Sequence, residues 1–149
     1  MLDLEDELRK LVKALDDSMI EYAVCGGLAM AVHGAPRATI DIDLFVRAED
    51  ADRIEELAAT FGYTFRAHPM TFADGAVRIH RVTKIDPHDG ETLMLDLLLV
   101  TPPTQHVWDS RERLPWSGRM ISVVSREGLI ALKRFRNSYQ DLADIERLS

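Results

Sequence analysis

The hydrophobic and polar positions of this chain follow two periods, one typical of helices and one typical of strands. Leucine and valine residues recur at helical spacing between Leu4 and Leu15, among acidic residues, and predict an amphipathic helix. Ser125 stands where it can cap a later helix. Further helices are expected over about 28–33, 49–61, 125–137 and 140–148.

Alternation with a period of two and short apolar runs predict the strands. Over 39–46, aliphatic residues alternate with Asp41, Asp43 and Phe45, as in a strand of a sheet. The run over 92–100 is the most apolar strand candidate and stops at two prolines, so we expect it at the centre of the sheet. The other strands are expected over 20–24, 63–66, 76–84 and 121–124, the second and third of these forming an antiparallel pair.

This order of elements favours an α/β (α+β) fold with a mixed β-sheet, antiparallel at its edges, flanked by helices and followed by C-terminal helices. A chain of 149 residues, 46% hydrophobic and 29% charged, has the size and composition of one globular domain. No repeat, low-complexity tract or linker interrupts the sequence. We therefore expect a single domain over 1–149.

Charge and cysteine content narrow the possible functions. Eighteen Lys and Arg residues against 25 Asp and Glu give a net charge of −7, so the surface as a whole repels nucleic acid and any such contact is local. No apolar run is long enough to span a bilayer and the acidic N-terminus lacks a signal-peptide pattern, so we expect a cytoplasmic protein without membrane contact. The single cysteine, Cys25, excludes an internal disulfide, and the five histidines lack the spacing of zinc ligands.

Three aspartates are the strongest candidates for chemistry. Asp41 and Asp43 lie two positions apart on a predicted strand, so both carboxylates face the same side and repel one another unless a cation lies between them. Asp96 interrupts the most apolar strand, where an unpaired carboxylate would cost about 5 kcal/mol or more. Oxygen donors of this kind suit Mg²⁺, which takes the rest of its ligands from water and phosphate oxygens.

A glycine pair precedes the first two aspartates. Gly26 and Gly27 lie between a predicted strand and a predicted helix, where backbone N–H groups and the helix N-terminus can hold phosphate. Taken alone, the glycines are compatible with a simple turn and the Asp-x-Asp pair with a solvated strand end. Their order along the chain, with Asp96 after them, favours a metal-assisted nucleotide site.

The run from Gly26-Gly27 to Asp41-Ile42-Asp43 resembles the signature of the DNA polymerase beta-like nucleotidyltransferase superfamily. In that signature a Gly-Ser or Gly-Gly turn opens a helix, and an Asp-x-Asp pair lies on the next strand. Asp96 resembles the third metal-binding carboxylate of the superfamily. The chain carries Gly27 where many members have serine, which removes a hydroxyl but keeps the backbone donors.

The C-terminal part extends this resemblance. The segment 129–148, with Lys133, Asp141 and Asp144, is similar to the C-terminal helices of the minimal and abortive-infection-toxin (AbiEii-type) branches. Those helices commonly carry a Lys-Asp pair, and Gln140 replaces the lysine here, so a catalytic or substrate role for Asp141 does not follow.

The resemblance implies the nucleotidyltransferase fold and a reaction. A nucleoside monophosphate would pass from a nucleoside triphosphate such as ATP to an acceptor hydroxyl, and pyrophosphate would leave. The resemblance also implies that Asp41, Asp43 and Asp96 bind two Mg²⁺ ions, with Asp96 contacting the ion nearer the acceptor. Gly26 and Gly27 would contact the β- and γ-phosphates.

Two cations and one histidine accompany this set. Arg37 and Lys133 are candidates for offsetting phosphate charge, since Arg grips phosphate bidentately and Lys acts as a point charge. Arg37 is equally compatible with an ion pair to Asp41 or Asp43. His33 either orients a catalytic group or packs at a helix end, and it is not part of the predicted catalytic set.

The acceptor is left open by the sequence. Trp108 and Trp116 either stack a base or pack in the interior, and the arginines of the last third form either a local nucleic-acid face or solvated helix charges. The acceptor classes are tRNA, a protein side chain and small molecules such as aminoglycosides. The alternatives to catalysis are a non-catalytic nucleotide-binding module and a component of a toxin–antitoxin pair that binds a partner protein.

Overall fold

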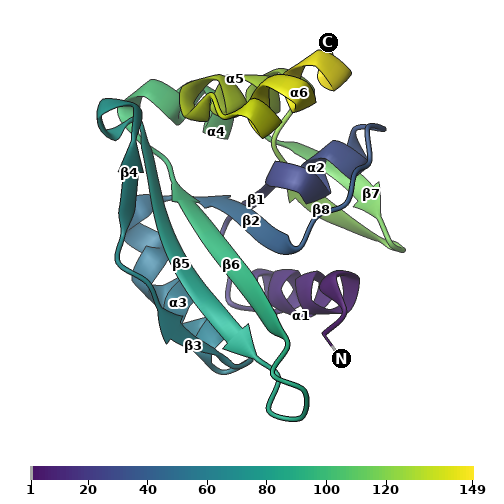
Figure 1. Cartoon of the computed structure of the whole chain (residues 1–149), viewed down its shortest axis with the longest axis vertical. Helices are drawn as coiled ribbons and strands as arrows, with labels where there is room; N and C mark the ends of the chain where they lie inside the picture. Colours follow the sequence, from purple (N-terminus) through teal and green to yellow (C-terminus); the bar gives the residue numbers. More distant parts are fainter. Residues whose placement is uncertain (1) are drawn as a thin grey trace.

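A computed structural model describes residues 2–149 (Figure 1). Its α-helices are α1 (Leu4–Asp17), α2 (Gly26–Val32), α3 (Ala51–Ala59), α4 (Gln105–Asp109), α5 (Arg126–Arg136) and α6 (Tyr139–Leu148). Its strands are β1 (Ala23–Cys25), β2 (Asp41–Val46), β3 (Tyr63–Arg66), β4 (Met70–Phe72), β5 (Val77–Ile85), β6 (Thr92–Leu99), β7 (Glu112–Trp116) and β8 (Arg119–Val123).

The strands form one mixed sheet in the order β3-β5-β6-β2-β1-β8-β7, with β4 paired to β5. β2 runs parallel to β6, and β1 runs parallel to β8, whereas the remaining neighbours are antiparallel. The predicted mixed sheet with antiparallel edges and flanking helices is therefore confirmed. β6, the most apolar run, lies in the interior of the sheet as expected, since it pairs with strands on both sides.

The two faces of the sheet are covered differently. On one face, the buried Glu7 of α1 reaches the sheet, where its carboxylate accepts hydrogen bonds from Tyr63 at 2.8 Å and Lys84 at 2.9 Å. On the other face, the ring of Trp108 in α4 packs edge-on against Phe45 of β2. Figure 1 shows α5 and α6 lying across one end of the strands, while much of β5 and β6 below them is not covered by a helix. One end of this second face is thus enclosed by helices and the rest is open.

Local sequence signals account for most element boundaries. Asp3 caps α1 through a hydrogen bond from the Asp6 N–H, and Ser125 caps α5 through one from Gly128, as predicted for Ser125. α2 begins at Gly26 itself, two residues before the predicted start. β4 and β7 are not among the predicted strands.

Within residues 2–149, no helix combines the length and apolar character that crossing a bilayer requires. The predicted single domain over 1–149 includes Met1, which lies outside the described residues. The remainder is built on one connected sheet with one cluster of buried hydrophobic residues.

Candidate active site

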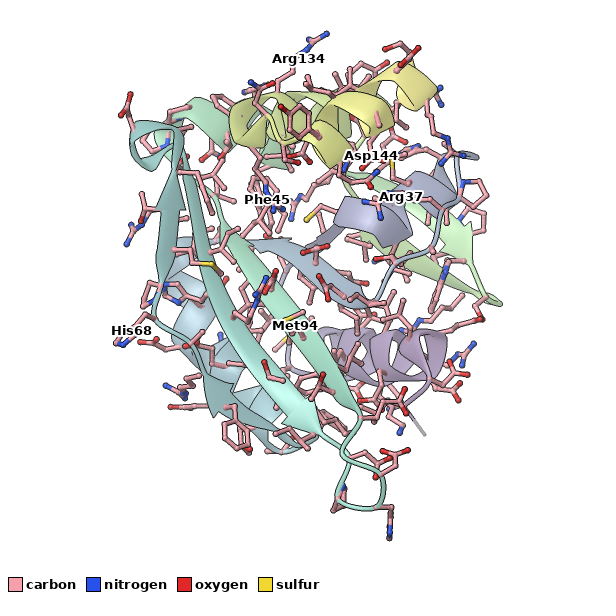
Figure 2. All side chains as sticks on the ribbon, viewed as in Figure 1. Arg37, Phe45, His68, Met94, Arg134 and Asp144 are labelled. Carbon is pink, nitrogen blue, oxygen red and sulfur yellow. The ribbon has the colours of Figure 1, made fainter. Side chains whose placement is uncertain are left out.

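The pairing of β2 with β6 brings the three predicted carboxylates together. Asp43 and Asp96 are direct cross-strand partners in this parallel pair, and Asp41 pairs with Met94 two positions earlier. Since side chains alternate along a strand, all three aspartates project from the same face of the sheet. This is the face whose lower part is open, where Figure 2 shows Met94. The three aspartates thus share one face of neighbouring strands, and their convergence on a single two-metal site stays a prediction.

Among residues 2–149, no side chain forms an ion pair with Asp41 or Asp43. Burial, and then the charges of Asp96 and Asp41, raise the pKa of Asp43 from 3.8 to about 7. Burial and the charge of Asp96 likewise raise the pKa of Asp41. The Oδ1 atom of Asp41 is buried without a hydrogen-bond partner. An orphaned carboxylate oxygen of Asp41, with the carboxylate of Asp43 two positions along on the same face, is a suitable donor set for a hard divalent cation.

Asp96 has a different environment. Its side chain is 4% exposed, and the Arg81 guanidinium donates to both carboxylate oxygens, from Nε to Oδ1 at 2.7 Å and from Nη2 to Oδ2 at 2.9 Å. Within the described residues, no group of three His, Cys, Asp or Glu side chains is arranged to hold one metal ion. Asp41 and Asp43 can therefore provide the ligands of one ion. The predicted second ion would need the oxygens of Asp96, and both already accept hydrogen bonds from Arg81.

This charge distribution leads to a prediction for stability. A carboxyl whose pKa is raised by folding destabilises the folded state once the pH rises above its unfolded value, and the cost is complete above the folded pKa. Without divalent ions, Asp43→Asn should therefore raise the free energy of unfolding by about 4 kcal/mol at pH 8 and leave it unchanged below pH ~4. Urea unfolding at a series of pH values measures the difference. The same substitution at the exposed Asp52 of α3 is the control, and equal effects at both positions would contradict the account.

Gly26 allows the turn to approach the carboxylates. It adopts φ +64° between β1 and α2, a conformation that favours glycine. A Cβ atom at Gly26 would fall 2.7 Å from Cγ of Asp43, so only glycine leaves room for that carboxylate. The preceding residue, Cys25, gives α2 no side-chain cap. The glycine turn thus lies directly against Asp43, as the sequence pattern predicted.

Gly27 is constrained by a different neighbour. A Cβ atom there would lie 2.7 Å from Cβ and Oγ1 of Thr39 and 3.3 Å from Nη1 of Arg37. Gly27 therefore lets the segment that leads into β2 close against α2. Gly27 therefore lacks a side chain for reasons of packing. Its backbone N–H is the group that a phosphate could contact.

The two predicted phosphate-binding cations meet at one buried carboxylate, Asp144 of α6. Arg37 donates to it from Nε at 2.9 Å and from Nη2 at 3.0 Å, and Lys133 donates from Nζ at 2.8 Å. Gln140 adds a further hydrogen bond at 2.8 Å. Figure 2 shows Arg37 and Asp144 side by side. Arg37 thus pairs with neither Asp41 nor Asp43, the partners considered from sequence.

Asp144 has the environment of a structural anchor. Its burial acts to raise its pKa, but the hydrogen bonds from Arg37, Lys133 and Gln140 outweigh burial and lower the pKa from 3.8 to about 2. A lowered pKa stabilises the fold above the ordinary value, and this contribution is lost as the pH falls from about 4 towards 2. Asp144 therefore ties α6 to α5 and to the segment before β2 at neutral pH.

We expect Asp144→Asn to lower the free energy of unfolding by about 3 kcal/mol at pH 7, because two cations lose their buried counter-charge. The loss should shrink as the pH approaches 2. Chemical denaturation of this variant and of Glu146→Gln, an exposed position on the same helix, checks the prediction. If both variants lower the free energy of unfolding by the same small amount, Asp144 does not anchor α6.

α5 contributes a narrow cavity beside Asp43. Its lining includes Gly26, Asp43, Lys133 and Arg136, and its volume of about 20 Å³ holds about one water molecule. Arg136 is exposed and forms no side-chain hydrogen bond or ion pair with any of residues 2–149. Two larger open clefts, of about 460 and 540 Å³, contain none of the three aspartates. Arg136 is thus a cation beside the carboxylates that is available to an anionic ligand.

Several other residues considered in the sequence analysis have packing or capping roles in the fold. Nε2 of His33 lies 2.8 Å from the Val124 carbonyl oxygen, in agreement with its packed interpretation. Asp141 forms a capping box with Ser138 at the start of α6. Trp108 is buried in the core.

Trp116 and the arginines of the last third of the chain interact with separate parts of the fold. The Trp116 ring lies under the Arg9 guanidinium. The arginines of the last third are dispersed: Arg119 pairs with Asp16, Arg126 donates to the Leu148 carbonyl, and Arg134 points outward in Figure 2.

Sequence reasoning missed three residues of this region. Arg81 carries no motif, because its contact with Asp96 depends on the β5–β6 register. Arg136 was noted only as one of many arginines, although its spacing of three from Lys133 places both on one side of α5. Asp144 was noted as part of a resemblance, but nothing in the sequence indicated that it would hold Arg37 and Lys133 together.

Comparison with known proteins identifies the family. The family model of aminoglycoside-2''-adenylyltransferases matches residues 7–128, a range that includes all three aspartates and both glycines. The chain belongs to this aminoglycoside-2''-adenylyltransferase family. It is thereby placed in the nucleotidyltransferase superfamily that the Gly-Gly and Asp-x-Asp run predicted, whereas the abortive-infection-toxin branch is not confirmed. Lys133, Arg136 and Asp144 lie beyond the matched range.

Solved structures share the fold of this adenylyltransferase-family protein. A candidate nucleotidyltransferase from Thermotoga maritima is 19% identical with a TM-score of 0.62, over 99% of this chain and 90% of that chain. ANT(2'')-Ia in complex with adenylyl-2''-tobramycin is 15% identical with a TM-score of 0.63, over 95% and 84%. The lincosamide antibiotic adenylyltransferase LnuA, with lincomycin bound, is 14% identical with a TM-score of 0.59, over 97% and 95%. A search of curated proteins finds no match.

Proposed function

We propose that this protein is a magnesium-dependent nucleotidyltransferase that transfers AMP from ATP to a hydroxyl group of a small molecule and releases pyrophosphate. The observation that carries the proposal is the cross-strand placement of Asp43 beside Asp96, with Asp41 on the same face and Gly26 against Asp43. A protein that only binds nucleotides has no need of three acids at such cost to its own stability. Membership of the adenylyltransferase family favours ATP among the triphosphates.

The residues divide between the nucleotide and the acceptor. We assign the backbone N–H groups of Gly26 and Gly27 to the β- and γ-phosphates. Asp41, with its unpartnered Oδ1, and Asp43, which forms no ion pair within residues 2–149, are assigned to Mg²⁺. When bound, Mg²⁺ would supply the positive charge that offsets the triphosphate and its leaving pyrophosphate. Asp96, on the neighbouring strand, is assigned to the acceptor hydroxyl.

The group transfer balances with these residues. The acceptor oxygen forms a bond to the α-phosphorus, and the bond from that phosphorus to the β-phosphate oxygen breaks. The hydroxyl proton passes to the Asp96 carboxylate and then to solvent. No covalent enzyme intermediate is required.

One cation of α5 completes the phosphate site in this proposal. Arg136, which is exposed and lacks a partner within residues 2–149, would face the outer phosphates. Lys133 lines the same cavity but is buried and held by Asp144, so it would add only positive charge behind Arg136. Arg37 grips Asp144 with two nitrogens and is assigned a supporting role, holding the segment that leads to β2. The nucleotide-binding assignment of Arg37 made from sequence is thus the weakest of the set.

A small, hydroxyl-bearing acceptor is favoured over tRNA. The net charge of −7 opposes a polyanionic acceptor and favours a polycationic one. The family name refers to aminoglycosides, and the two named enzymes with a similar fold act on or bind antibiotics, tobramycin in one structure and lincomycin in the other. Aminoglycosides are therefore the first acceptor class to test.

The test supplies α-labelled ATP, Mg²⁺ and one acceptor at a time from panels of aminoglycosides, lincosamides and tRNA. The proposal expects label in a small molecule whose mass has increased by one AMP residue. Label in RNA or protein would show that the acceptor is a macromolecule and not a small molecule. If no label is transferred in the presence of Mg²⁺, either to these acceptors or in cell extract, the proposed activity is wrong.

A further inference from the structure

Arg81 is placed against Asp96 by the sheet itself. The two residues are direct cross-strand partners in the antiparallel β5–β6 pair, and both strands lie inside the sheet. The guanidinium plane presents two N–H donors to the two carboxylate oxygens in the bidentate geometry that makes arginine–carboxylate pairs strong. Asp96 is 3% exposed, so its negative charge is offset mainly by this one neighbour.

The other two aspartates contrast with this arrangement. No Arg, Lys or His side chain of residues 2–149 lies within ion-pair distance of Asp41 or Asp43. One oxygen of Asp41 is buried and unpaired. Of the three negative charges on this face, Arg81 offsets one. A single divalent ion on Asp41 and Asp43 offsets the remaining two.

We propose that Arg81 is the permanent counter-ion of Asp96 on the acceptor side of the site, so that the protein with bound triphosphate takes one divalent ion, where the superfamily resemblance implies two. The inference rests on the proposed function. A second ion on Asp96 would have to displace two charge-assisted hydrogen bonds and lie beside a guanidinium that does not lose its proton. Arg81 acts through Asp96 and is a positioning residue.

This arrangement changes what Asp96 does. Arg81 holds both oxygens of Asp96 through paired hydrogen bonds, which fixes the orientation of the buried carboxylate. The acceptor hydroxyl would then meet an oriented carboxylate without an intervening metal ion. The cation that accompanies the triphosphate stays on Asp41 and Asp43.

Counting bound ions tests the proposal without any turnover. Mn²⁺ is titrated into the full chain in the presence of the non-hydrolysable analogue α,β-methylene-ATP, and bound Mn²⁺ is measured by electron paramagnetic resonance. We expect about one ion per chain for the wild type and about two for Arg81→Met, which keeps the length of the side chain without its charge. Arg78→Met, an exposed change on the same strand, is the control and should bind as the wild type does.

A second variant avoids the risk that Arg81→Met does not fold. Asp96→Asn keeps the shape of the side chain, and it should leave the ion count and affinity within about twofold of wild type if Asp96 holds no ion. Two ions in the wild type, or one ion in a folded Arg81→Met protein, would overturn the inference while leaving the proposed function in place. Binding of no Mn²⁺ with the analogue in any variant would overturn both.

Discussion

Asp96→Asn is expected to lower nucleotide transfer by at least about 100-fold, which corresponds to about 2.7 kcal/mol of barrier, while triphosphate binding stays close to that of wild type. Asparagine keeps the size and one acceptor oxygen of the side chain, so the contact with Arg81 is partly retained. It removes the charge that draws the proton from the acceptor hydroxyl. The phosphates are bound elsewhere, at the glycine turn and at Asp41 and Asp43.

The measurement pairs a transfer assay with a triphosphate titration in the presence of Mg²⁺. Asp41→Asn should impair both, because Asp41 is assigned to the ion that accompanies the triphosphate. Glu146→Gln, an exposed change of the same type, should impair neither. Transfer by Asp96→Asn at the wild-type rate would make Asp96 a structural acid, and the mechanism with three carboxylates would fail.

Gly26→Ala is expected to weaken Mg²⁺–triphosphate binding at least about tenfold and to destabilise the fold by about 3 kcal/mol. Two effects add at this position. The φ of +64° is unfavourable for alanine, and the new Cβ would lie 2.7 Å from Cγ of Asp43, so the carboxylate or the turn has to move. Movement of either separates the phosphate donors from the ion assigned to Asp43.

Gly34→Ala provides a matched control for the first effect. Gly34 has a φ of +82°, and a Cβ there meets no atom within 4 Å, so only the backbone strain is introduced. The difference between the two variants isolates the crowding of Asp43. If both lose the same stability and bind the triphosphate equally well, close approach of the turn to Asp43 has no role in binding.

Most of the frame of this protein follows from patterns within the sequence. α1 and α5 have helical spacing and side-chain caps, and β2 and β6 have the alternation or apolar character of strands. The order of the glycine pair, Asp-x-Asp and Asp96 was enough to predict which carboxylates lie on neighbouring strands. They do so because β6 is the parallel neighbour of β2 and places Asp96 in register with Asp43, whereas their joint role in binding metal stays a prediction.

The missed elements have weak local signals. β7 contains Pro115, which argues against a strand, but β7 is the edge of the sheet, where the missing N–H removes no ladder bond. β4 has three residues and pairs with β5 alone. Strands this short and marginal depend on the neighbour that they join, which is tertiary information.

The ion pairs of the site were missed for the same reason, because they depend on tertiary structure. Arg81 and Asp96 lie 15 residues apart, and Arg37 and Asp144 lie 107 apart, so no window of the sequence contains the longer pair. The sequence supplied the charged residues but not their pairing. Pairing decides which cation is available to phosphate: Arg37 and Lys133 are held by Asp144, whereas the exposed Arg136 is not paired with any of residues 2–149.

The most direct test of the central claim is pyrophosphate release from ATP by the purified protein, measured with and without Mg²⁺ and with and without an aminoglycoside acceptor. The account predicts one pyrophosphate for each adenylylated acceptor, dependent on both additions in the wild type and lost in Asp41→Asn. Pyrophosphate release that persists in Asp41→Asn, or a folded wild-type protein that binds ATP but releases none with any acceptor tested, would contradict it.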